Sequence, residues 1–135
     1  MFSRLRRIMK GRMPLYELLV EGLTRKNTMG DGLHLFARDP EGIWFFDADE
    51  SGVSIIVAES DEARQQENYK HSMVVDARSR IVGNLEHEGG NVPVYSGNPE
   101  TKEVIDAFVD QVLRIIRSHP YMHHQDELTQ NDEAW

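Results

Sequence analysis

Apolar and polar residues alternate between positions 33 and 59, and two turn signals divide the stretch into three runs. The runs span residues 33–37, 43–46 and 53–58, and a period of two is typical of strands with one buried face. Asp39-Pro40-Glu41-Gly42 has Pro at its second position and Gly at its fourth, as type I turns often do. Asp49-Glu50-Ser51-Gly52 ends the second hairpin in the same way. The pattern predicts an antiparallel β-meander.

Strand alternation predicts two faces for this meander, because successive side chains point to opposite sides. We expect one face to form the core, with Leu33, Leu35, Ile43, Phe45, Val53, Ile55 and Val57. The opposite face is too aromatic for full exposure to water, with His34, Phe36, Trp44, Phe46, Ser54 and Ile56. Either a helix of the same chain or a partner covers it. Since aromatic residues dominate interface hot spots, the candidate protein interface is Phe36, Trp44, Phe46 and Ile56.

Helical spacing of apolar residues occurs on both sides of the meander. Leucines at positions 15, 18, 19 and 23 predict a core-packing helix that ends near Thr24. A second helix is predicted from Pro99, which follows the capping residue Asn98, and a wide apolar stripe runs along it to Ile116. His119-Pro120 ends this helix.

The stretch between the meander and the last helix is less regular. Ser60 is a candidate cap for a polar segment at residues 61–70, which is either a solvated linker helix or a loop. Further strands are predicted at residues 72–76, 81–82 and 92–95, and Pro93 places the last at an edge. The predicted fold is α+β, with an antiparallel sheet of about five to six strands packed with an N-terminal and a long C-terminal helix. We expect one domain over residues 1–118 and an acidic, disordered tail over residues 119–135.

Charge is unevenly distributed along the chain. The net charge is −8, yet residues 1–26 hold seven basic residues and two acidic ones, which leaves a net charge of +5. Residues 1–13 form a basic amphipathic head, with Arg4, Arg6, Arg7, Lys10 and Arg12. The head is predicted to bind an acidic partner or a polyanion, nucleic acid included. Alternatively its arginines face water while its apolar side packs, or it is a targeting or membrane-surface segment.

Motifs for chemistry are weak in this sequence. Residues 47–52 have oxygen-bearing side chains and a Gly at calcium-loop spacing, but Ala58 stands where a bidentate Glu is needed. His119, His123 and His124 have metal-ligand spacing beside a Pro that disfavours a regular helix. There is no cysteine, which excludes disulfides and thiol catalysis. We therefore expect no catalytic residue, no metal and no cofactor.

Element order, size and acidity over residues 1–118 resemble those of type III secretion chaperones, without a shared sequence motif and with a basic head that departs from that family. The resemblance implies a small dimeric binder of other proteins. We expect a non-enzymatic protein-binding module of adaptor, chaperone, immunity or inhibitor type, which is cytoplasmic, forms a homodimer and has no transmembrane segment. A small-ligand-binding or enzymatic domain and a nucleic-acid-associated factor remain alternatives.

Overall fold

The computed structural model describes residues 13–27, 32–87, 90–93 and 99–128. Within them the chain forms one seven-stranded antiparallel sheet, in the order β6-β5-β4-β3-β2-β1-β7. The helices are α1 (Leu15–Lys26), α2 (Asp61–Gln65) and α3 (Pro99–Ser118). The strands are β1 (Leu33–Asp39), β2 (Gly42–Asp49), β3 (Gly52–Ala58), β4 (His71–Asp76), β5 (Ile81–His87), β6 (Gly90–Pro93) and β7 (His123–His124). This architecture confirms the predicted α+β fold.

The first three strands form the predicted meander, and two tight turns fix its register. Asp39 pairs with Gly42 across the first turn, and Asp49 pairs with Gly52 across the second. The Asp39 carboxylate accepts hydrogen bonds from the backbone N–H groups of Glu41 and Gly42, at 2.9 and 3.2 Å. Gly42 has a φ of 150°, and a Cβ added there would lie 2.5 Å from the carbonyl oxygen of Ala58. Glycine is therefore required where β2 leaves the turn.

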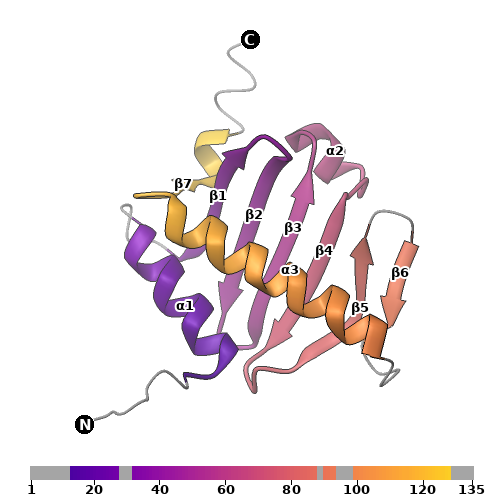
Figure 1. The fold of residues 1–135 in the computed structure, drawn as a ribbon. Helices are drawn as coiled ribbons and strands as arrows, with labels where there is room; N and C mark the ends of the chain where they lie inside the picture. Colours follow the sequence, from indigo (N-terminus) through magenta and orange to yellow (C-terminus); the bar gives the residue numbers. More distant parts are fainter. Residues whose placement is uncertain (1–12, 28–31, 88–89, 94–98, 129–135) are drawn as a thin grey trace, which may run out of the picture.

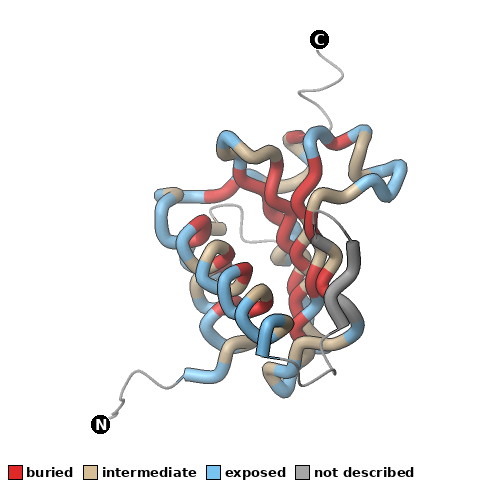
Figure 2. The backbone as a smooth tube through the Cα atoms, turned by 45° about the vertical axis from the view of Figure 1, so that its right-hand side comes forward, coloured by how far each residue is buried: buried red, intermediate tan, exposed pale blue. Residues whose placement is uncertain are grey.

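Helices α1 and α3 cover one face of the sheet, here called the first face (Figure 1). In Figure 2 both helices stand on the same side, with their buried residues turned towards the strands. Gly22 of α1 allows close packing, because a Cβ there would lie 2.9 Å from a side-chain carbon of Ile116. The buried helix residues of this layer are Leu19, Leu23, Ile105, Phe108, Val112, Ile115 and Ile116.

The structure corrects the predicted face of β2. Trp44 pairs with Ala37 and Val57, and Phe46 pairs with Leu35 and Ile55, so these residues share the first face. Trp44 and Phe46 are fully buried there, and the Trp44 ring stacks on Phe108 of α3 with centroids 5.8 Å apart. Ile43 and Phe45 lie on the opposite face instead, together with Phe36 and Ile56. Alternation within each strand was predicted correctly, but the alignment of β2 with its neighbours was wrong.

The expectation of a disordered tail was wrong for residues 119–128. His123 and His124 form β7 beside Phe36 and Leu35 of β1. Met122 and Leu128 are buried. Residues 129–135 lie outside the described residues, as does the basic head with Arg4, Arg6, Arg7, Lys10 and Arg12. The polar segment after Ser60 is helical over five residues, from Asp61 to Gln65.

The turn between β4 and β5 is organised by the carboxylate of Asp76. It accepts hydrogen bonds from the backbone N–H groups of Arg80 and Arg78, each at 2.9 Å, and from Nε of Arg80 at 3.0 Å. These donors favour the charged form, so the pKa of Asp76 lies below its ordinary value, chiefly because of the Arg80 backbone N–H. The same turn holds Ser79 at a φ of 66°.

We expect Trp44→Ala to lower the free energy of unfolding by about 3–5 kcal/mol, because it removes a fully buried indole and leaves a cavity. Urea unfolding of the wild type and the variant measures the loss. Leu18→Ala is the control, since Leu18 of α1 is 40 % exposed. A loss for Trp44→Ala no larger than that of the control would contradict burial of Trp44 in the core.

Asp76→Asn should lower the melting temperature most near neutral pH. A carboxyl whose pKa is lower in the folded state stabilises the fold above its unfolded pKa, and the contribution disappears as the pH falls through the folded value. The difference between wild type and variant should therefore shrink below about pH 4. Melting followed by circular dichroism from acid to neutral pH tests this, with the exposed Glu103→Gln as control. A difference that does not change with pH would refute the assignment.

Candidate functional site

The second face of the sheet carries its own smaller hydrophobic cluster. Its buried residues are Phe36, Ile43, Phe45, Ala58 and Leu128, with Ile56 and Ala63 packed against them while partly buried. We call this set the second-face cluster. Four of the five buried members come from the meander and one, Leu128, comes from the C-terminal residues. Ala63 belongs to α2, so a short helix and the end of the described chain together cover this cluster.

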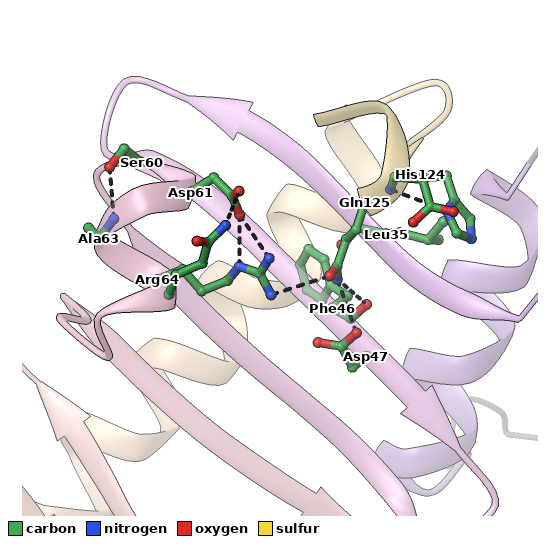
Figure 3. Close-up of polar contacts among 11 residues, drawn as sticks. Leu35, Phe46, Asp47, Ser60, Asp61, Ala63, Arg64, His124 and Gln125 are labelled. Atoms are coloured by element: carbon green, nitrogen blue, oxygen red, sulfur yellow. Dashed lines mark hydrogen bonds and ion pairs between the residues drawn. The ribbon is translucent and has the colours of Figure 1, made fainter. Parts of the chain in front are cut away.

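Helix α2 contains a buried ion pair between Asp61 and Arg64 (Figure 3). The Asp61 side chain is 4 % exposed, and its Oδ1 accepts hydrogen bonds from Nη2 and Nε of Arg64 at 2.8 and 3.1 Å. Oδ2 accepts a third hydrogen bond from Gln65 at 2.8 Å. The Arg64 guanidinium also lies 4.4 Å from the ring centroid of Phe45, in cation–π geometry. The Ser60 hydroxyl caps the helix by accepting from the N–H of Ala63 at 3.0 Å, which confirms the predicted cap.

The C-terminal residues lie against β1 and extend the sheet at its edge. The Gln125 side chain donates hydrogen bonds to the backbone oxygen of Leu35 at 3.2 Å and to Oδ1 of Asp47 at 3.1 Å (Figure 3). His34 lies next to the same carboxylate, with Nδ1 2.8 Å from Oδ1 of Asp47. The His123 ring stacks on Phe36 with centroids 5.2 Å apart. One face of Phe36 is thus covered by the C-terminal residues.

Beside the covered cluster, the second face is open. Val74 of β4 is 41 % exposed and pairs with Ser54 of β3 and Val82 of β5. Ile56 lies one row away on the same face and is partly buried. We call Ile56, Val74 and Val82 the apolar strip. Acidic residues flank it on both sides: Asp47 pairs with Ser54, and Glu86 accepts a hydrogen bond from the Ser72 hydroxyl at 3.0 Å.

The predicted interface residues are divided between the two faces. Phe36 and Ile56 lie on the second face, where Phe36 is 1 % exposed and Ile56 partly buried. Trp44 and Phe46 belong to the first-face core and contact α3 and the rest of that core. The residues that sequence reasoning missed on the second face are Val74, Val82 and the C-terminal Leu128. Alternation with Met73 and Val75 could have indicated Val74, because those neighbours are buried on the first face.

A hollow of about 250 Å³ lies where the end of α3 meets β1. It is lined by Ala37, Arg38, His119, Pro120, Tyr121 and His123. The His119 ring holds the two elements together, with Nδ1 2.8 Å from the oxygen of Ile115 and Nε2 3.0 Å from that of Arg38. The side chains of His119, His123 and His124 do not converge on one point. No group of three His, Asp or Glu in the described part of the chain is arranged to bind a metal ion.

A second polar cluster, also missed by sequence reasoning, joins three elements on the first face. Nε2 of His71 lies 2.8 Å from Oε2 of Glu41, and Gln111 of α3 donates to Oε1 of Glu41 at 2.7 Å. Lys70 donates to the backbone oxygen of Glu41 at 2.7 Å. His71 is 6 % exposed and packs against the Phe108 ring. These contacts tie the first turn of the meander to β4 and α3, which is a structural role.

Comparison with models of protein families, with curated proteins and with solved structures finds no match for this chain. None of the described helices is long and apolar enough to cross a lipid bilayer. The function is therefore argued from the geometry of the second face.

Arg64→Met should lower the free energy of unfolding by about 2–3 kcal/mol, because it leaves the buried carboxylate of Asp61 without its charged partner. The estimate is below the usual cost of breaking a buried pair, since the Arg64 side chain is 26 % exposed. Adding Asp61→Asn should recover part of the loss in a double-mutant cycle measured by urea unfolding. Strictly additive losses would show that the two side chains do not stabilise each other.

Proposed function

We propose that this protein is a protein-binding module that uses the second face of its sheet. The observation that carries the proposal is the apolar strip, in which Val74 is 41 % exposed directly beside the second-face cluster. Strand residues that are exposed, apolar and contiguous with a hydrophobic cluster are typical of surfaces that a partner covers. The first face offers less exposed apolar strand surface to a partner, because α1 and α3 cover its core (Figure 1).

Charge indicates the chemistry of the partner. Asp47 and Glu86 flank the apolar strip, and the chain as a whole has a net charge of −8. A partner surface that combines apolar side chains with Lys or Arg would complement both features, and the opposite charges would speed its association. An acidic rim of this kind disfavours nucleic acid on the same face, because phosphates would be repelled.

Photo-crosslinking tests the proposal at two matched positions. A photoreactive amino acid replaces Val74 on the second face or Leu18 on α1, two apolar residues that are 41 % and 40 % exposed. In the cells from which the protein comes, the probe at Val74 should crosslink to a discrete protein, and the probe at Leu18 should not. Size-exclusion chromatography of the free protein then shows whether a second copy of the chain is the crosslinked species.

Val74→Glu should weaken capture of the crosslinked partner by at least about tenfold, because it places a charge in the centre of an apolar contact. Leu18→Glu should leave capture unchanged, and both variants should melt within a few degrees of the wild type, since both residues are exposed in the free protein. Equal crosslinking from the two positions, or equal loss of capture in the two variants, would refute the second face as the binding surface.

A further inference from the structure

Residues 121–128, here called the C-terminal clip, reach around the edge of the sheet at β1. Met122 is 1 % exposed and belongs to the first-face core. Leu128 is fully buried and belongs to the second-face cluster. Six residues apart, these two side chains are anchored on opposite faces of the same sheet. The clip therefore holds the edge of β1 from both sides, and Figure 1 places β7 and the short helical turn after it next to β1.

Between its two anchors the clip binds largely through backbone and amide groups. Its strand β7 is two residues long and pairs antiparallel with Leu35 and Phe36 of β1. The N–H of Met122 donates to the oxygen of Lys26 at 2.9 Å. The Gln125 side chain donates to the backbone of Leu35 and to Asp47. This is the way in which an extended peptide adds a strand to a sheet edge, with affinity from main-chain hydrogen bonds and selectivity from side-chain pockets.

Between its two buried anchors, Met122 and Leu128, the clip pairs with β1 over a short length. Pro120 separates it from α3, so it can leave without disrupting that helix. Its pairing with β1 covers two of the seven residues of that strand. The contact that joins it to α2 is long, with 3.5 Å between Arg64 Nη1 and Gln125 Oε1. A segment with few strand hydrogen bonds can open locally without unfolding the rest of the sheet.

We propose that the edge of β1 is a binding site for an extended peptide segment of the partner, and that the C-terminal clip occupies this site within the same chain until the partner displaces it. The inference rests on the proposed function and extends the binding surface from the apolar strip to β1. The backbone of this segment pairs with Leu35 and Phe36. The segment also carries two apolar side chains about six residues apart. One of them takes the place of Met122 and the other that of Leu128.

Competition with the clip sets the apparent affinity of such a segment. When the binding-competent state is a fraction of the population, the apparent dissociation constant rises by the inverse of that fraction. A variant with a weakened clip therefore binds the segment more tightly, because the site is vacant in a larger fraction of the molecules. This direction distinguishes a clip that a second segment can replace from one that is an inseparable part of the fold, whose loss would weaken every other contact or leave it unchanged.

The test uses the full chain and a labelled synthetic peptide of residues 119–128. Fluorescence anisotropy is measured with wild type, Leu128→Asp and the control Leu18→Asp. The peptide should bind Leu128→Asp at least about tenfold more tightly than it binds the other two proteins. A control peptide that carries Met122→Asp and Leu128→Asp should bind none of them. Hydrogen exchange at the amides of β1 should be faster in Leu128→Asp and slow again when the peptide is added.

Equal affinity for wild type and Leu128→Asp would overturn the proposal, as would equal binding of the control peptide. If Leu128→Asp does not fold, Gln125→Ala replaces it, because that change removes the side-chain hydrogen bonds to Leu35, Phe46, Asp47 and Arg64 and keeps both anchors. It should tighten peptide binding about two- to fivefold, and no tightening overturns the proposal. Wild-type dimers that dissociate when the peptide is added would assign the site to a second copy of the chain, which also overturns it.

The two proposals fail separately. A crosslink from Val74 together with equal peptide affinities would keep the partner-binding face and remove the competing clip. Tight peptide binding to Leu128→Asp without any crosslink from Val74 would keep the edge site and remove the partner-binding face.

Discussion

Two four-residue turns decide which side chains of β2 meet the helices. Because Asp39 lies opposite Gly42 and Asp49 opposite Gly52, even-numbered residues of β2 share a face with odd-numbered residues of β1 and β3. Trp44 and Phe46 then pack under α3, and Phe45 packs under the guanidinium of Arg64. A slip of one residue would exchange these rings between the faces and leave α1 and α3 on a different surface. The two hydrophobic clusters both depend on this alignment.

The two clusters differ in how they are covered. The first-face core is packed against two helices of twelve and twenty residues, whereas the second-face cluster is covered by a five-residue helix and the C-terminal clip. The ion pair and the Ser60 cap are local to α2, so its position depends on tertiary contacts such as that of Arg64 with Phe45, because such short helices form poorly alone. The weakly covered cluster is continuous with the exposed apolar strip. This asymmetry supports the proposal of a binding surface on the second face.

Much of the fold follows from local sequence rules. The three strands of the meander, the helix from Pro99 and the cap at Ser60 were predicted from residue period and turn chemistry. The faces of β2 could have been predicted as well, because a type I turn at residues 39–42 already aligns residue 37 with residue 44. Hydrophobic alternation alone puts Phe45 on the first face, whereas the pairing set by the turn puts Trp44 there. Contacts that join distant residues could not be predicted, such as Gln111 with Glu41 or Gln125 with Asp47, because no local pattern encodes them.

Met122 and Leu128 make the two hydrophobic clusters thermodynamically dependent on each other. The clip contributes one side chain to each, so a fluctuation that lifts it exposes apolar surface on both faces in the same event. Opening the edge of β1 therefore costs free energy partly because Met122 leaves the first-face core and becomes exposed to water. Substitutions in the first-face core near Met122 then change the fraction of molecules in which the edge of β1 is open, although the substituted residues do not contact that edge.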